Sequence, residues 1–282
     1  MILGSDKMGG DLIREHVTDG MPNDLIFGTL AKTLNGMGIP FTKHVLMLWV
    51  AAFVTIFMTL WATRKYRKDP NAKPKGISQL YELLMDFIKK DMVIPNIGIK
   101  HANRWAPLAA TFFVFILTCN LLGLVPFFEK LGGAHSGGAT PTGNFGVTVG
   151  LATVTFFAII IAGTLKHGFI GHWKNMIPSG VPAPVLIILI PIEIIGMFVK
   201  PLALTLRLGA NMTAGHIGML AIFGLPYLIA PEGGIQWGVF GFVAVLLNFG
   251  VYFLEIIVSL VQAYVFTLLS TVFIGMAIHA DH

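Results

Sequence analysis

The sequence predicts an all-α membrane protein with about five transmembrane crossings and one amphipathic helix at the membrane surface. Hydrophobic residues make up 55% of the 282 residues and charged residues only 12%, whereas a soluble domain carries about 25% charged residues. Several uncharged runs also reach the roughly 20 apolar residues that a spanning helix needs. The chain therefore cannot cover its surface with polar groups in water, and an integral membrane protein is the expected class.

The basic residues are placed as in a membrane protein rather than in a nucleic-acid-binding protein. One group follows the first apolar run, and a second flanks a later short loop: Arg64, Lys65, Arg67, Lys68, Lys73 and Lys75, then Lys166 and Lys174. Such short basic connections lie on the cytoplasmic side, so the net charge of +5 does not indicate a nucleic-acid partner. We expect residues 1–43 to be an extracytoplasmic segment, residues 44–282 to form a single membrane domain, and the C-terminus to be cytoplasmic.

The first three spans are predicted at residues 45–63, 105–128 and 145–165. Residues 77–92 lie between the first two and place Ile, Leu and Tyr at helical spacing, with Glu, Asp and Lys on the opposite side. This pattern predicts an amphipathic helix on the membrane surface. Residues 129–144 are Gly-rich and polar, and we expect a loop on the outer side.

The last two apolar runs, at residues 184–230 and 235–278, are too long for simple spans. As helix each would extend about 65 Å at 1.5 Å per residue, against a hydrocarbon core of about 30 Å. Each run either folds into two spans or forms one long tilted helix. The second run contains no proline, so we favour two long, tilted, antiparallel helices joined by a turn at residues 231–234.

Arg207 is the strongest functional signal, because it lies within the first of these runs. An arginine near the bilayer centre costs about 2.5–3.5 kcal/mol on insertion scales. It cannot lose its proton, since its pKa exceeds about 12, so it needs an anionic or strongly polar partner. Glu193, Lys200 and Arg207 are seven residues apart and share one helix face, with Asn211 one turn beyond.

Antiparallel folding about the turn predicts which residues of the two helices lie level. Two pairs of residues have their sequence midpoint near residue 235, at the turn, and should therefore lie level: His216 with Glu255, and Arg207 with Gln262. Ser259 lies between Glu255 and Gln262 on the second helix. A His–Glu pair at a low-dielectric site can exchange protons with water near neutral pH. Small residues near Arg207 allow another helix to approach closely, either within this chain or on a moving partner: Gly209, Ala210, Ala214, Gly215 and Gly218.

The remaining polar candidates have plainer interpretations. Asn120 within a span more often makes a helix–helix hydrogen bond than binds a transported ion, and Cys119 is expected to serve as a small apolar side chain. Lys200 more often snorkels or pairs with Glu193 than moves protons. Metal binding is the less favoured reading of His167 and His172, and Glu232 is expected to cap or solvate its turn. No metal or cofactor is expected.

Three motifs resemble subunit a of F-type ATP synthases, the proton-channel stator subunit of the Fo sector. They are Pro-Leu-Ala-Leu-Thr-Leu-Arg-Leu-Gly-Ala-Asn-Met-Thr-Ala-Gly-His at 201–216, Gln-Ala-Tyr-Val-Phe at 262–266 and Asn-Leu-Leu-Gly-Leu-Val-Pro at 120–126. The resemblance covers about residues 40–280. It implies a stator subunit that works beside the c-subunit ring, the b-subunit peripheral stalk and the rest of the F1Fo complex. The long N-terminal segment favours a bacterial plasma membrane over an organelle.

The resemblance also implies residue roles. Arg207 would face the rotor carboxylate and separate two aqueous half-channels. The outer half-channel would be lined by Asn211, His216, Glu255 and Gln262, and the cytoplasmic one would pass Glu193. His216 and Glu255 are exchanged relative to many bacterial members, and Gly123 replaces the Asp of some members.

Two other classes remain open from the residues alone: an ion-coupled secondary transporter and a structural subunit in which Arg207 forms a static ion pair. Transporters usually carry internal repeats, and no repeat is visible here. The sequence has no phosphate-binding Gly-Lys-Ser/Thr motif, so nucleotide chemistry is expected in another subunit.

Overall fold

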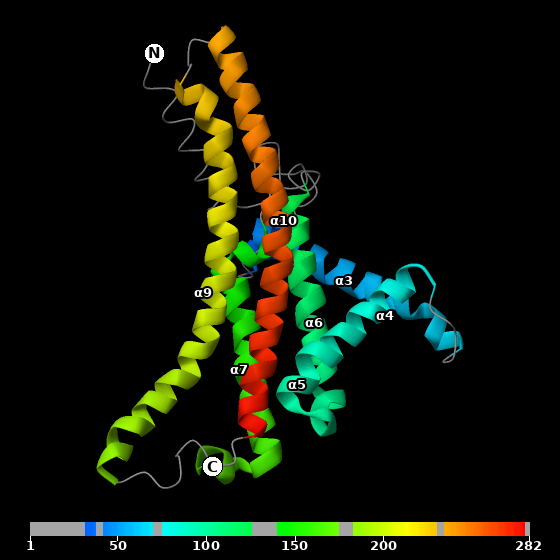
Figure 1. The fold of residues 1–282 in the computed structure, drawn as a ribbon, viewed down its shortest axis with the longest axis vertical. Coiled ribbons are helices and arrows are strands. Elements are labelled where there is room, and N and C mark those ends of the chain that lie inside the picture. The colour runs from blue at the N-terminus through cyan, green and yellow to red at the C-terminus, as the bar shows by residue number, and fades with distance from the viewer. Residues whose placement is uncertain are drawn as a thin grey trace. The chain divides into compact units, whose positions relative to one another are not determined.

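A computed structural model describes the chain at residues 32–37, 42–69, 75–125, 140–174, 183–229 and 234–279. These residues are almost wholly helical and contain no β-strand (Figure 1). Five helices are long and apolar enough to cross a membrane, which confirms the predicted fold class. Several predicted features lie outside the described residues: most of the N-terminal segment, the end of the 105–128 span, most of the 129–144 loop, the turn with Glu232, and the side chain of His172.

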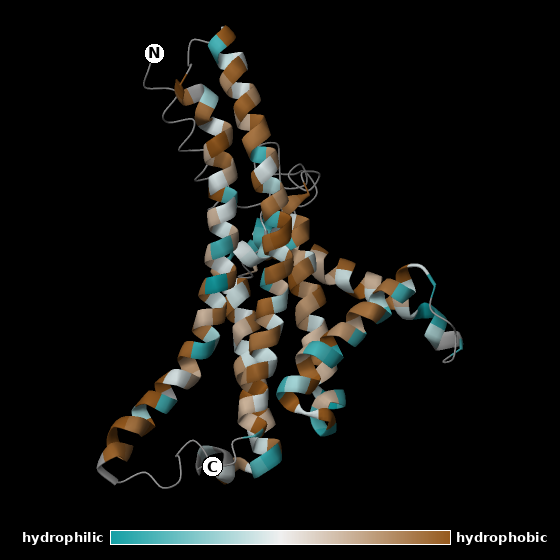
Figure 2. Ribbon diagram, in the orientation of Figure 1, coloured by the Kyte–Doolittle hydropathy of each residue, from teal (hydrophilic) through white to brown (hydrophobic). Residues whose placement is uncertain are grey.

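The five long helices follow the predicted spans in chain order. They are α3 (Lys43–Lys68), α6 (Ile99–Leu124), α7 (Phe145–His167), α9 (Ala183–Ile229) and α10 (Ile235–Ile278). The last two contain 47 and 44 residues and are each continuous, so the two-span alternative for these runs is wrong. Figure 2 shows that α9 and α10 are largely hydrophobic along their length, with isolated hydrophilic positions.

The amphipathic region is a helix with a change of winding. It comprises α4 (Ile77–Phe87), the π-helix η1 (Ile88–Val93) and α5 (Ile94–Ile97). Pro95 lacks a backbone N–H and cannot continue the α-helical ladder, and the wider π turn lies just before it. The outer face keeps exposed leucines beside an ion pair of 2.7 Å between Lys90 and Asp86.

The chain divides into two compact units. The first comprises Met1–Phe53, Leu117–Asn144 and Leu208–Val261. Its described core contains almost fully buried Leu208 and Met212 on α9 and Cys119 on α6. The hydroxyl of Tyr252 on α10 donates to the carbonyl of Leu124 at 3.1 Å, which joins α10 to the end of α6.

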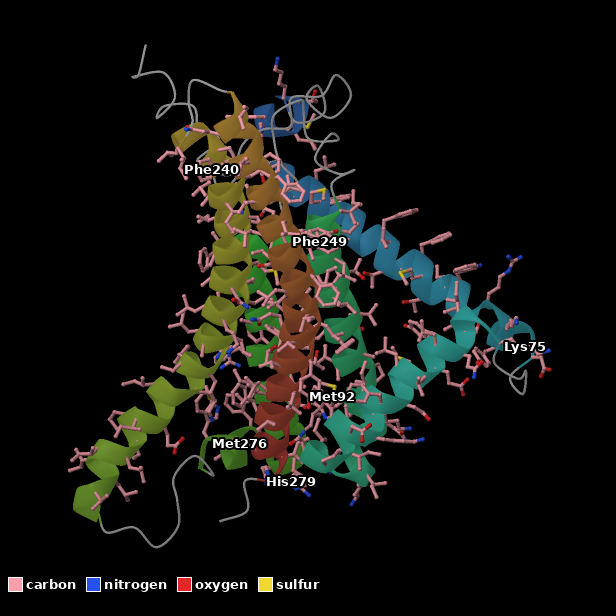
Figure 3. The ribbon with its side chains drawn as sticks, turned by 45° about the horizontal axis from the view of Figure 1, so that its top comes forward. Lys75, Met92, Phe240, Phe249, Met276 and His279 are labelled. Carbon is pink, nitrogen blue, oxygen red and sulfur yellow. The ribbon has the colours of Figure 1, made fainter. Side chains whose placement is uncertain are left out.

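The second unit comprises Val54–Ile116, Phe145–Arg207 and Gln262–His282. Here the last turns of α10 contact the segment that leads into α6: the Thr271 hydroxyl donates to the Met92 carbonyl at 3.3 Å, and His279 Nε2 lies 3.0 Å from the Ile97 carbonyl. Figure 3 labels Met92 and His279 in this region.

Three contacts in the second unit hold α7 against α9 and α10. The Thr155 and Ser270 hydroxyls lie 3.2 Å apart, and His167 Nε2 lies 3.1 Å from the Ile278 carbonyl. The Phe156 ring stacks on the Phe198 ring of α9, with centroids 5.3 Å apart. In this unit α9 thus packs on α7 through Phe198, whereas Leu206 and Arg207 of α9 are exposed.

Candidate functional site

Arg207 lies in the second unit on the uncovered face of α9. Leu204 and Thr205 are 2% and 3% exposed, whereas Leu206 and Arg207 are exposed. Among the described residues Arg207 forms neither an ion pair nor a hydrogen bond. An apolar helix therefore presents a permanent positive charge outward without a counter-ion from the described chain.

The other charged residues of this face do not neutralise Arg207. Lys200 Nζ lies 5.6 Å from the centroid of the Phe273 ring, a cation–π contact between α9 and α10. In the described part of the second unit Lys200 does not pair with Glu193, which is exposed. Gln262 on α10 is only 8% exposed.

A group of polar side chains, buried except for the half-buried His216, occupies the first unit. We call these residues the polar cluster: Asn120, Thr140, Thr142, His216, Glu255 and Ser259. The amide of Asn120 is fully buried and joins two elements. Its Nδ2 donates to the Ser259 carbonyl at 3.3 Å, and its Oδ1 accepts from the Thr142 hydroxyl at 2.6 Å. Asn120 thus makes a hydrogen bond between two helices.

His216 lies in this cluster on α9, in contact with a segment that the sequence analysis interpreted only as loop. Its Nε2 is hydrogen-bonded to the hydroxyl of Thr140. Thr140 immediately precedes the 3₁₀-helix η3 (Pro141–Gly143). The carbonyl of Gly143 accepts a hydrogen bond from the Thr213 hydroxyl at 3.2 Å, one turn before His216. The end of the loop is therefore fixed against α9.

Glu255 and Ser259 form the α10 side of the polar cluster. Glu255 is 3% exposed and Ser259 is fully buried, and neither Glu255 Oε2 nor Ser259 Oγ has a hydrogen-bond partner among the described residues. Buried polar atoms are normally satisfied by protein or ordered water. This side of the cluster is therefore suited to bound water.

Glycine at position 215 makes the approach of α10 possible. A Cβ at Gly215 would overlap Oε1 and Cδ of Glu255 and would lie 3.0 Å from Oε2. Residues 215 and 255 are thus level across antiparallel helices, in agreement with the register predicted for His216 and Glu255. The predicted level of Arg207 with Gln262 stays a prediction.

Asn211 does not join the buried cluster. It lies on the exposed face of α9, one turn beyond Arg207, with Ala210 and Ala214 also exposed. Small side chains therefore continue past the arginine on the uncovered face. This arrangement leaves room for a close-packed neighbour there.

Sequence reasoning missed Thr140, Thr142 and Tyr252. The two threonines belong to a Gly-rich polar stretch, and nothing in that composition distinguishes a buried hydroxyl from a solvated one. Tyr252 is one of many aromatic residues in α10. Their partners on α6 and α9 come from distant parts of the chain.

The two units carry groups of different chemistry. The first unit holds an imidazole and a carboxyl among buried hydroxyl and amide groups, a set that can pass protons to and from water. The second unit holds a guanidinium that cannot titrate and that has no counter-ion among the described residues. The imidazole and carboxyl of the first unit can exchange protons, and the guanidinium of the second unit can attract an external anion.

Comparisons with known proteins point to one family. A model of the family described as ATP synthase A chain matches residues 45–275. The chain is 41% identical over 278 residues to ATP synthase subunit a of Chloroherpeton thalassium, covering 95% of this chain and 77% of that protein. It is 39% identical to ATP synthase subunit a of Chlorobium phaeobacteroides, covering 98% and 79%, and 37% identical to that of Anaeromyxobacter dehalogenans, covering 99% and 73%.

Proposed function

This chain belongs to the ATP synthase A chain family and is an integral membrane protein of the Fo sector, and we propose that it carries protons to and from the rotor with Arg207 as its central residue. In this proposal two aqueous half-channels lead to a carboxylate on the c-subunit ring. Arg207 separates the half-channels. The sequence contains no phosphate-binding Gly-Lys-Ser/Thr motif, and ATP chemistry is assigned to other subunits of the F1Fo complex.

One observation carries the proposal: Arg207 is exposed on an apolar helix without a counter-ion from the described chain. Burying such a charge against lipid costs several kcal/mol on most scales (about 2.5–3.5 by insertion). The static ion pair of the structural-subunit alternative would instead require an acidic partner close to the guanidinium. The nearest acid along its own face, Glu193, lies fourteen residues earlier on the same helix, about 21 Å away along the axis. A carboxylate on another subunit supplies the missing charge.

The members of the polar cluster on α9 and α10 support the outer half-channel. Glu255 and Ser259 keep buried polar atoms that need water, and the His216 imidazole is hydrogen-bonded to Thr140 in the same cluster. We assign the outer half-channel to His216, Glu255 and Ser259 with Asn211 and Gln262. Glu193 is assigned to the cytoplasmic half-channel, because it is exposed on α9 two helical turns before Lys200.

The charge arrangement explains how proton flow turns the rotor. A protonated rotor carboxylate is neutral and can face lipid, whereas an ionised one must face a cation. Arg207 stabilises the ionised form and favours release of its proton, and its fixed charge repels hydrated protons that would leak between the half-channels. Each charge that crosses the membrane gains about 2.3 kcal/mol per 100 mV, and the offset of the two half-channels gives that energy a direction.

The expected neighbours and orientation follow from this role. The c-subunit ring contacts the uncovered face of α9, and the b-subunit peripheral stalk holds the chain against rotation. The basic residues after α3 and at the end of α7 favour a cytoplasmic position for those ends. With five crossings the N-terminus then lies outside, and the bacterial relatives favour a plasma-membrane location.

Replacement of Arg207 by Ala tests the proposal. Removing the charge lowers the cost of membrane insertion, by about 2.5–3.5 kcal/mol, so the complex should assemble in normal amount. ATP-driven proton pumping in inverted membrane vesicles should fall to background, and passive proton permeability of vesicles stripped of F1 should rise. Lys200→Ala is the matched control, because Lys200 is a second cation on α9 that rests on Phe273.

The outcomes separate the alternatives. The control should pump at close to the wild-type rate. If Arg207→Ala assembled and still pumped protons, the proposal would be wrong. If Arg207→Ala failed to assemble while Lys200→Ala assembled, a static structural ion pair would be the better account.

A further inference from the structure

A loop segment is buried inside the first unit beside the polar cluster. Thr140 and Thr142 are 3% and 0% exposed, although loops normally run over the surface because their polar groups need partners. Both hydroxyls bond to polar side chains rather than to their own backbone: Thr142 to Asn120 and Thr140 to His216. The segment is therefore held by elements that carry the candidate site.

The backbone of this segment is anchored independently of Thr140. Thr142 is held by the α6 amide at 2.6 Å, and the Gly143 carbonyl is held by Thr213 of α9 at 3.2 Å. Thr140 has extended backbone angles (φ −61°, ψ 121°) and directs its side chain to His216. The Thr142 and Gly143 contacts thus fix the segment, and the third contact joins Thr140 to the imidazole of His216.

Gly123 on α6 provides the space for Thr140. A Cβ at Gly123 would overlap Thr140 Oγ1 and would lie 2.6 Å from its Cβ and 2.9 Å from its Cα. The Cα belongs to the backbone and cannot rotate away. Any larger residue at position 123 must therefore displace Thr140 from His216.

We propose that Thr140 is the positioning residue of His216, and that Gly123 is required to admit it. A hydroxyl can donate to a neutral imidazole nitrogen and can accept from a protonated one. The Thr140 contact therefore persists when His216 gains or loses a proton, and the ring keeps its place through each cycle. This inference rests on the proposed role of the chain in proton transfer.

The elements of this unit also bring other polar and ionisable groups near the segment that holds His216. Glu255 comes from α10, against Gly215. Tyr252, on the same helix, donates its hydroxyl to Leu124. The described part of α6 in this unit contributes the neutral Asn120, and the 140–143 segment contributes hydroxyls. Each Thr140 variant leaves these other groups unchanged, so a shift in the pH dependence of pumping reports the loss of the Thr140 contact.

The test replaces Thr140 in the assembled complex. Thr140→Val keeps the shape and removes the hydroxyl, so ATP-driven pumping per assembled complex should fall about tenfold, as for loss of a hydrogen bond to a group that becomes charged. The pH profile of pumping should also shift. Thr140→Ser should restore both the rate and the profile.

Thr142→Val is the matched control, because its hydroxyl is buried in the same segment but bonds Asn120 rather than His216. It should lower the amount of complex but leave the pH profile of the assembled fraction unchanged. Gly123→Ala is the second variant. It keeps the hydroxyl but displaces it, and it should reproduce the profile of Thr140→Val even if the latter assembles poorly.

The inference is overturned if assembled Thr140→Val or Gly123→Ala complexes pump with the wild-type rate and pH profile. It is also overturned if Thr142→Val shifts the profile as much as Thr140→Val, because the effect would then be general packing. Arg207→Ala is measured in the same vesicles. If Arg207→Ala loses pumping while Thr140→Val pumps normally, only the positioning role of Thr140 is refuted. If Arg207→Ala still pumps, the proposed function is refuted.

Discussion

Gly215 permits the sharpest prediction from the helix packing. A Cβ at this position would overlap the carboxyl of Glu255, a side chain that is 3% exposed. Gly215→Ala therefore forces Glu255 to move or the helices to separate. Gly218→Ala, three residues later on the same helix, meets nothing within 4 Å and serves as the matched control.

The magnitude follows from two opposing effects. Replacing glycine by alanine within a helix stabilises it by up to about 1 kcal/mol. Overpacking a tight contact costs about 1–3 kcal/mol. Gly218→Ala should show only the first effect, and Gly215→Ala both. The two variants should therefore differ in stability by about 1–3 kcal/mol, with Gly215→Ala the weaker.

The assay compares thermal inactivation of detergent-solubilised complexes, together with proton pumping in vesicles. Glu255→Asp shortens the carboxyl side chain by one methylene and should relieve part of the overlap. The double variant Gly215→Ala with Glu255→Asp should therefore be less impaired than the sum of the single variants, which is the sign of a direct contact. Equal behaviour of Gly215→Ala and Gly218→Ala, or strict additivity in the double variant, would refute the reasoning.

Two further predictions concern contacts in the separate units. Gly275→Ala should reduce the amount of assembled complex more strongly than Gly250→Ala. A Cβ at position 275 would overlap the backbone carbonyl of Asn96, whereas a Cβ at position 250 meets nothing within 4 Å. Equal amounts of the two variants on immunoblots would contradict this prediction. Asn120→Leu should lower the thermal stability of the complex by about 1–3 kcal/mol, since it leaves buried hydrogen-bonding groups unpaired, and an unchanged inactivation temperature would count against the Asn120 contacts.

The helical architecture was predictable because it depends on bulk composition and period. Long uncharged runs can satisfy their backbone in lipid only as helices, so the five spans and the amphipathic helix were readable from the sequence. The continuity of α10 was also predictable, because its run of over 40 apolar residues contains no proline or other loop signal. The run of α9 contains prolines, so its continuity was favoured over two spans but not determined by the sequence. Arg207 stood out for the same reason: a charge that cannot titrate is conspicuous in an apolar run.

The register of α9 and α10 was partly predictable. An antiparallel pair about a short turn places residues of equal distance from the turn at one level, and Gly215 indeed lies against Glu255. This symmetry predicts level residues only where the two helices stay paired. It gave no information on which side chains face inward. Asn211, which the resemblance grouped with His216 and Glu255, lies on the exposed face with Arg207.

The sequence by itself determined the membrane class, the long helices and the one charge that demands an outside partner, because these depend on hydrophobicity and local spacing. Only the tertiary structure decided that Thr140 and Thr142 are buried in the polar cluster. It also decided that Gly123 leaves space for Thr140 and Gly215 for Glu255. Those contacts join residues up to about eighty positions apart through hydrogen bonds and close approach. Neither composition nor period records such contacts, because they arise only when distant helices meet.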